Sequence, residues 1–192
     1  MSTQPKPFIT AEQYLEIEKT AECKSEYYNG EMFLVAGANS DHNQISDNLS
    51  RVFGNEFLSR PCYVITRDLR VRVSRTGPYT YPDAILVCGE REWADSSRST
   101  LLNPTVIFEV LSDSTEAYDR GKKFHQYLQL PSLREYILVS QQDFHVDQFV
   151  LHPDGEWHLR SYASLDAVVE LPSVGCSISL RDIYFKTDLM GN

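Results

Sequence analysis

Two acidic side chains lie in segments that the sequence otherwise makes apolar. Asp83 follows Pro82 and precedes the apolar run 84–87, and Glu109 lies within the apolar segment 106–111. A carboxylate in a buried strand costs several kcal/mol unless it is paired or binds a cation. For either acid alone, a strand-end position facing solvent or a structural ion pair is the alternative. Together the two acids suggest a cation site at one edge of a sheet.

A lysine on the following segment supplies a candidate positive charge. The spacing predicts a helix from Ser114, as its cap, to about Leu130, and Lys123 and Tyr127 share one face of it because they are four residues apart. Lys123 can therefore point back over the sheet edge where Glu109 lies. The alternative is an ordinary solvated helix lysine.

The elements upstream of these residues have clear local signals. A capping box that begins at Thr10 predicts a short first helix ending before Lys24. Asn-Gly at 29–30 predicts a hairpin over 25–35, because both residues tolerate positive φ. Apolar residues spaced by four, three and four predict a helix over 40–59.

The remaining pattern predicts mostly strands. Period-two alternation indicates a half-buried strand, whereas continuous apolar runs indicate strands buried on both faces. The predicted strands are 69–73, 81–88, 105–111, 134–140 and the hairpin 144–151/157–162, and a last short helix covers 180–184. We therefore predict an α/β fold with a mixed sheet flanked by helices and a β-hairpin-rich C-terminal extension.

Length and composition set further bounds. The 192 residues fit one domain spanning 1–192, with residues 1–8 expected to be loose. The chain has 18 basic and 27 acidic residues, a net charge of −9, so a nucleic-acid partner needs a local basic strip or bound cations. The apolar runs are too short for a membrane span, and the N-terminus lacks a secretory pattern. The four cysteines form no C-x-x-C pair, which argues against a zinc site or a disulfide framework and favours a cytoplasmic location.

Arginines on one predicted strand suggest a nucleic-acid surface. Arg70 and Arg72 share a strand face and can contact phosphates. An ordinary solvated strand face explains them equally well.

The chemistry-bearing segments also resemble a known group of proteins. The sequence is similar to the PD-(D/E)xK nuclease superfamily and, more closely, to the Uma-type putative restriction endonucleases, which are common in cyanobacteria. The residues that carry the likeness are Tyr81-Pro82-Asp83-Ala84, Asn103-Pro104, 109–115, 119–124, Tyr127 and 130–136, with Tyr28-Asn29-Gly30-Glu31, His42-Asn43 and Arg70-Val71 upstream.

The resemblance implies roles for these residues. In the superfamily two acids, here Asp83 and Glu109, hold Mg²⁺ (or Mn²⁺), and the carbonyl of Val110 can provide a third ligand. The usual lysine two residues after the second acid is replaced by Leu111. Known variation moves the basic residue to the next helix, where Lys123 matches it.

Three further residues are site candidates of lower rank. Glu26 matches an early acid that many superfamily members use as an extra ligand or water anchor, with a solvated hairpin acid as the alternative. His42 opens the second predicted helix, where it can face the cleft or lie on the surface. Tyr127 lies on the Lys123 face.

Two functions follow from this pattern. The first is a metal-dependent endonuclease that hydrolyses phosphodiester bonds, in DNA. The second is a catalytically inactive nuclease-fold protein that binds DNA or another protein, because of Leu111 and the acidic charge. Two-strand cutting needs two active sites, so a homodimer is expected. The apolar hairpin with Val146, Phe149 and Trp157 can form its interface or belong to the core.

Overall fold

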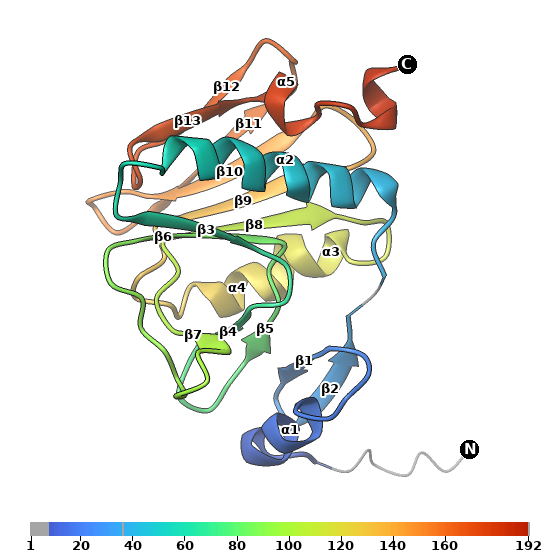
Figure 1. Cartoon of the computed structure of the whole chain (residues 1–192), viewed down its shortest axis with the longest axis vertical. Coiled ribbons are helices and arrows are strands. Elements are labelled where there is room, and N and C mark those ends of the chain that lie inside the picture. The colour runs from blue at the N-terminus through green and yellow to red at the C-terminus, as the bar shows by residue number, and fades with distance from the viewer. Residues whose placement is uncertain (1–7, 36, 192) are drawn as a thin grey trace.

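The computed structural model describes residues 8–35 and 37–191 (Figure 1). The looseness expected for the N-terminus concerns residues 1–7, which lie outside the described part, and Phe8, which is exposed.

The helices and strands follow the predicted order with several additions. The helical elements are α1 (Ala11–Glu18), α2 (Ser40–Glu56), α3 (Glu116–Tyr118), the π-helix η1 (Asp119–Lys123), α4 (Phe124–Tyr127), α5 (Leu180–Ile183) and the 3-10 helix η2 (Asp188–Met190). The strands are β1 (Ser25–Tyr28), β2 (Glu31–Leu34), β3 (Cys62–Thr66), β4 (Arg70–Arg72), β5 (Tyr79–Thr80), β6 (Ala84–Cys88), β7 (Thr100–Leu101), β8 (Val106–Leu111), β9 (Glu135–Ser140), β10 (Val146–Leu151), β11 (Trp157–Tyr162), β12 (Val168–Leu171) and β13 (Cys176–Ser179).

A six-stranded mixed sheet forms the centre of the molecule. Its order is β11-β10-β9-β8-β6-β3, with β8 and β9 parallel and the other neighbours antiparallel. Every residue of β8 and β9 is buried, so their continuous apolar runs do mark strands covered on both faces. The α/β fold class with a mixed sheet flanked by helices is confirmed.

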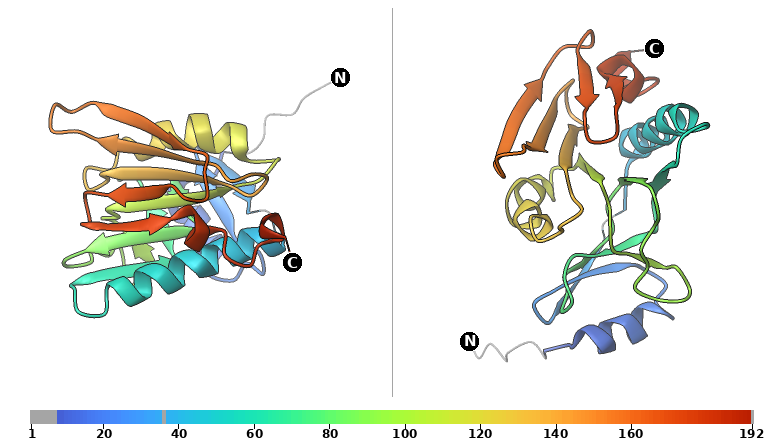
Figure 2. Two further views of the ribbon diagram at one scale, coloured as in Figure 1. Left: turned by 90° about the horizontal axis from the view of Figure 1, so that it is seen from above. Right: turned by 90° about the vertical axis from the view of Figure 1, so that its left-hand side faces the viewer.

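Helices cover both faces of this sheet, as the two views in Figure 2 show. Alternate residues of β8 enter different cores: Phe108 and Val110 join the core that contains α2, whereas Ile107 and Leu111 join the core that contains α4. By the same alternation Glu109 faces the side of η1 and α4. The strand period therefore decides which helix the buried acid meets.

A second sheet, of order β2-β1-β5-β4-β7, lies below the first in Figure 1. Tyr14 of α1 packs with Tyr27 and Tyr79 to form its small core. The β1–β2 turn has φ of 48° at Asn29 and 84° at Gly30, as an Asn-Gly hairpin requires. This hairpin brings Glu26 to the end of the central sheet.

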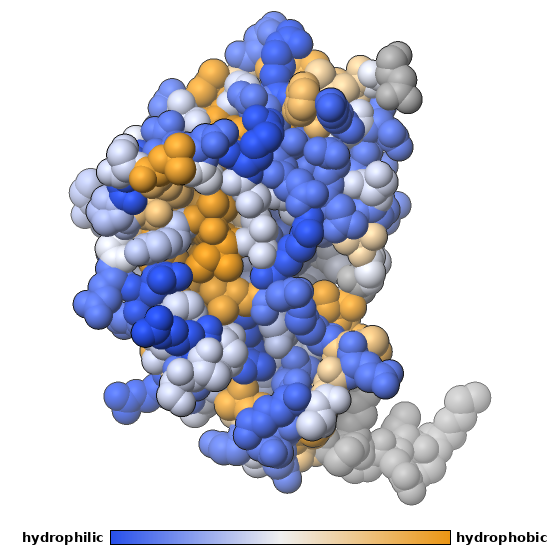
Figure 3. Space-filling model, in the orientation of Figure 1, coloured by the Kyte–Doolittle hydropathy of each residue, from blue (hydrophilic) through white to orange (hydrophobic). Residues whose placement is uncertain are grey.

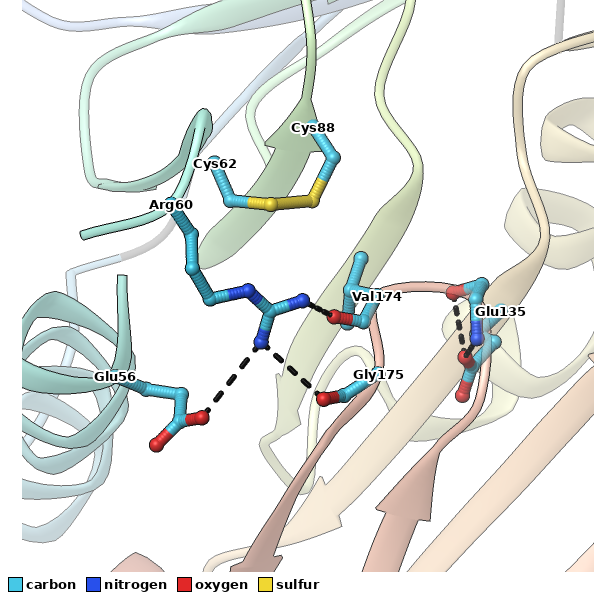
Figure 4. Close-up of a disulfide and its surroundings, with 8 residues drawn as sticks. Glu56, Arg60, Cys62, Cys88, Glu135, Val174 and Gly175 are labelled. Atoms are coloured by element: carbon cyan, nitrogen blue, oxygen red, sulfur yellow. Dashed lines mark hydrogen bonds and ion pairs between the residues drawn. A yellow bond between two sulfur atoms is a disulfide. The ribbon is translucent and has the colours of Figure 1, made fainter. Parts of the chain in front are cut away.

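The cysteine pattern was interpreted wrongly. Cys62 and Cys88 form a disulfide between β3 and β6, where they lie directly opposite each other (Figure 4). The sequence separation of 26 residues conceals this proximity, and β3 itself was not predicted. Beside it, Arg60 donates to the carbonyls of Val174 and Gly175 and thereby holds the β12–β13 turn.

The three apolar residues considered in the C-terminal hairpin pack onto the core. Strands β10 and β11 extend the central sheet, Val146 is fully buried, and Phe149 and Trp157 pack against Phe124 of α4. The dimer interface considered for these residues therefore has no support from their packing.

The single helix predicted from Ser114 is three consecutive helical pieces, of which the middle one is η1. The expected cap at Ser114 is wrong. The N-cap position is Thr115, and its hydroxyl forms no capping hydrogen bond but lies 2.9 Å from the hydroxyl of Ser112. None of the helices in 8–35 and 37–191 is long and apolar enough to cross a membrane.

Candidate active site

A cavity of about 630 Å³ opens where the central sheet, the β1–β2 hairpin and the N-terminus of α2 meet. Its walls come from segments far apart in the sequence. They include the predicted site residues Glu26, His42, Asp83, Glu109, Val110 and Lys123.

Asp83 is fixed by two polar contacts. It directly precedes β6. Because Ala84 pairs with Phe108 in the antiparallel strand β8, the Asp83 carboxylate lies beside the next residues of β8. Its Oδ2 accepts a hydrogen bond of 2.7 Å from the Val110 amide, and its Oδ1 lies 2.7 Å from His42 Nε2. His42 thus faces the cavity, where Asn39 caps the start of its helix.

Lys123 is the centre of a buried ionic cluster. Its Nζ lies 2.9 Å from Glu109 Oε1, 3.1 Å from Glu26 Oε1 and 3.5 Å from Asp119 Oδ1. The lysine side chain is only 7% exposed, so the alternative of a solvated helix lysine is wrong. The π-helical turn carries both Asp119 and Lys123, and such turns are frequent at functional sites.

Tyr127 completes the contacts of Glu109. Its hydroxyl donates to Glu109 Oε1 at 2.8 Å and lies 3.0 Å from Thr80 Oγ1. Glu26 is held from another side, because Oε1 also accepts from the Tyr81 amide at 3.1 Å. Glu26 is therefore not the solvated hairpin acid considered as its alternative.

The charges in this cluster are unbalanced. Burial raises the pKa of Glu109, and the neighbouring acids raise it further, although Lys123 opposes them. Burial alone would lower the pKa of Lys123, but the carboxylates of Glu109 and Glu26 outweigh it and hold that pKa well above its ordinary value. Lys123 is therefore a cation. The carboxylates of Glu26, Glu109 and Asp119 therefore lie around a single ammonium group, and Asp83 adds a fourth carboxylate to the same cavity.

The donor set fits a hard divalent cation. Carboxylate oxygens on Asp83 and Glu109, beside the backbone of Val110, are the ligand type that Mg²⁺ and Mn²⁺ prefer, and the excess negative charge needs a counter-ion. A separate group, Asp154, Glu156 and His158, brings its ligand atoms within 4.8 Å of one another, with His158 in β11 and the two acids in the turn between β10 and β11. That turn is exposed and does not line the cavity.

Arg70 and Arg72 do not join this site. They line a second cavity of about 460 Å³ that shares Asp68 and Tyr81 with the first. The guanidinium of Arg70 is bonded to Thr100 Oγ1 at 2.9 Å and to the Tyr81 hydroxyl at 3.3 Å. Their contact with phosphates stays a prediction.

Sequence reasoning missed several residues of the cavity, among them Asp119 and Gln141. Asp119 is buried beside Lys123, and its position four residues earlier on a helical segment could have identified it. Gln141, just after β9, also lines the cavity, and nothing in its sequence context indicates this.

A central mixed sheet flanked by helices, with two acids and a lysine at one end, is the arrangement that the resemblance to nucleases leads one to expect. The chain belongs to the Uma2 family, described as "Putative restriction endonuclease", whose sequence pattern matches residues 11–181.

Two relatives and a solved structure are similar to this chain. The uncharacterized protein slr1290 of Synechocystis sp. is 36% identical over 94% of this chain and 93% of its own length. A second Synechocystis protein, sll1609, also uncharacterized, is 34% identical over 84% of this chain and 92% of its own. The crystal structure of a "putative nuclease belonging to DUF820" from Anabaena variabilis matches with a TM-score of 0.76 at 18% identity, covering 92% of this chain and 97% of that one. That structure supports the fold.

Proposed function

We propose that this protein is a metal-dependent endonuclease that hydrolyses phosphodiester bonds in DNA. The observation that carries the proposal is the convergence of Asp83, Glu109 and Lys123 from three separate segments at one cavity. The nuclease-like family supports the reaction class.

Asp83 and Glu109 would hold Mg²⁺ or Mn²⁺, with the Val110 carbonyl as a third ligand. A bound ion of this kind lowers the pKa of a water molecule and neutralises charge on the reacting phosphate. The Val110 amide and His42 orient the Asp83 carboxylate before the ion arrives. Glu26 and Asp119, which also contact Lys123, provide additional negative charge in the same cavity.

Lys123 acts as a cation rather than a base. Its pKa is held well above the ordinary value, so it keeps its proton at neutral pH and cannot accept one from water. A fixed ammonium beside the metal site stabilises negative charge that develops on a phosphoryl oxygen. Leu111 at the usual lysine position is therefore compatible with activity, because Lys123 reaches Glu109 from the next helix.

The test is cleavage of supercoiled and linear DNA with Mg²⁺, Mn²⁺ or EDTA. We expect cutting with either metal, none with EDTA, and at least a 100-fold loss in Asp83→Asn, since one ligand and the orientation of the site are lost. Asp154→Asn is the matched control, because it alters a carboxylate in the exposed turn outside the cavity. Cutting that persists in EDTA or in Asp83→Asn would overturn the proposal.

The second candidate is a DNA-binding protein without catalysis, favoured by the net charge of −9 and by Leu111. Calorimetric titration with Mg²⁺ separates the two. Binding that Glu109→Gln abolishes supports the enzyme, whereas absent binding together with DNA affinity supports the second candidate. A homodimer, which two-strand cutting requires, belongs to the same proposal and is tested by light scattering.

A further inference from the structure

One wall of the active-site cavity is apolar and exposed. Tyr28, Phe33, Leu34 and Val35 are 40%, 45%, 76% and 41% exposed, and all four line the cavity. Twelve large hydrophobic side chains are exposed in the described part of the chain, so a third of them gather at this one place. Figure 3 shows hydrophobic colour at the surface over β2 and the segment that follows it. We call these four residues the β2 wall.

Exposed apolar side chains at the mouth of a polar site need a partner that is itself apolar on one face. A continuous duplex does not offer an apolar face to this wall. Its phosphates and sugars are solvated, and its base faces are stacked inside the helix. An unpaired base does, since every base has a π-face that stacks on aromatic and apolar side chains.

A second feature of the cavity points to a ligand with a hydrogen-bonding edge. Gln141 is only 9% exposed, and its Oε1 has no hydrogen-bond partner among the residues that the structure describes. Buried amide oxygens are almost always bonded, so this one is available to a donor that enters the cavity. The exocyclic amino groups of nucleobases are such donors.

Size and charge agree with the same occupant. A cavity of about 630 Å³ lies within the range that encloses ligands of nucleotide size. Lys122 is exposed on the cavity rim, with no ion pair to any residue in 8–35 or 37–191, and is suited to a backbone phosphate.

We infer, resting on the proposed function, that the cavity holds an unpaired nucleobase next to the reacting phosphate. The base stacks on the β2 wall and its edge donates to Gln141. The preferred substrate is then single-stranded or locally unpaired DNA rather than a continuous duplex.

Binding can be measured without cleavage. Fluorescence anisotropy of an end-labelled single-stranded oligonucleotide and of the same sequence as a duplex, in Ca²⁺ and in EDTA, gives the two affinities. We expect roughly tenfold or greater preference for the single strand in wild type, and quenching of a 2-aminopurine base placed in it, because that base stacks.

Variants assign the preference to the wall. Phe33→Ala and Leu34→Ala should each weaken single-strand binding by roughly fivefold or more and leave duplex binding unchanged. Gln141→Ala should weaken binding most for single-stranded oligonucleotides whose bases carry an exocyclic amino group. Leu159→Ala is the control, because Leu159 is 56% exposed on β11 and outside the cavity. All but Gln141 are surface positions, and circular dichroism checks the fold of each variant.

The outcomes separate this inference from the proposed function. Absent cleavage of every DNA, with single-strand preference and quenching retained, would refute only the nuclease activity. Equal binding of both forms, no DNA binding, or wall variants without effect would overturn the inference even if duplex DNA is cut. A dimer in wild type that Leu34→Ala converts to a monomer would also overturn it, because the wall would then be an interface between copies.

Discussion

Two clusters of buried polar groups lie on opposite faces of the central sheet and differ in how their charge is balanced. In the first, Glu135 at the start of β9 is fully buried, and it accepts hydrogen bonds from Ser173 and Gln148. In the second, Lys123 meets Glu26, Glu109 and Asp119 at the wall of the active-site cavity.

The first cluster is complete in itself. Both oxygens of Glu135 have neutral donors at 2.5 to 2.9 Å, and the contacts link the central sheet to the segment between β12 and β13. The second cluster has three carboxylates and one ammonium group, and it opens onto a cavity of about 630 Å³ that Asp83 also lines. A closed network with matched donors serves stability, whereas an open one with excess negative charge is suited to a cation from solution.

Replacing Lys123 should have the largest effect. Lys123→Met keeps the length of the side chain but leaves three buried carboxylates without a counter-ion. We expect the free energy of unfolding in EDTA to fall by about 3–5 kcal/mol, as for a broken buried pair, and cleavage to fall at least 100-fold. Urea unfolding and the DNA assay measure the two effects.

The matched control for that variant is Lys19→Met. Lys19 also pairs with a glutamate, Glu16, at 2.6 Å, but its side chain is 66% exposed. Such a pair contributes little, so both readouts should stay near wild type. Similar losses of stability and of cleavage in the two variants would show that burial of Lys123 does not explain its effect.

Glu135→Gln should separate stability from function. The new amide group turns a donor toward the donor of Gln148, which costs about 1–3 kcal/mol for an unsatisfied buried group. Burial raises the pKa of Glu135, so loss of the buried charge offsets part of that cost. Cleavage and Mg²⁺ affinity should be unchanged, because Glu135 does not line the cavity. A loss of Mg²⁺ affinity in calorimetry would show that the two clusters are coupled.

Asp119→Asn should stabilise the metal-free protein. Burial raises the pKa of Asp119 above the ordinary 3.8, despite the opposing effect of Lys123, so ionised Asp119 opposes folding at neutral pH. Removing its charge should raise the free energy of unfolding in EDTA by about 0.5–1 kcal/mol.

The pH dependence of Asp119 has a definite sign. Because the folded state holds this proton more tightly than the unfolded state, the contribution of Asp119 to wild-type stability should increase as pH falls from its raised pKa toward 3.8. The difference between Asp119→Asn and wild type in EDTA should therefore shrink toward low pH. If the difference in the free energy of unfolding instead widened toward low pH, the pKa of Asp119 would be lowered in the folded state rather than raised.

Much of the site could be predicted from sequence because its determinants are local. The period of two along β8 places Glu109 on one face, and a spacing of four places Lys123 with Tyr127 on one helix face. The Asn-Gly turn at 29–30 fixes the hairpin that carries Glu26.

What the sequence did not show depends on register and on tertiary contacts. Strand β3 was missed although Cys62–Thr66 is rich in β-branched and aromatic residues, which favour strands. The pairing of Cys62 and Cys88 depends on the register between β3 and β6, which the sequence does not show. The π-helical turn at 119–123 and the unpartnered amide of Gln141 exist only once distant segments pack together.

Tyr127→Phe should have the smallest effect and gives the finest test of the comparison. The hydroxyl that donates to Glu109 is lost, but Lys123 still contacts the same oxygen, so the carboxylate stays paired. We expect kcat to fall about fivefold with KM nearly unchanged, because a positioning contact is lost and no substrate contact is. Tyr184→Phe is the counterpart outside the cavity: its hydroxyl donates to the carbonyls of Ser140 and His145, and its loss should cost about 1 kcal/mol of stability without changing kcat. If both variants lowered kcat equally, the Tyr127 hydroxyl would have only a structural role. The contact between Tyr127 and Glu109 would then contribute nothing specific to catalysis.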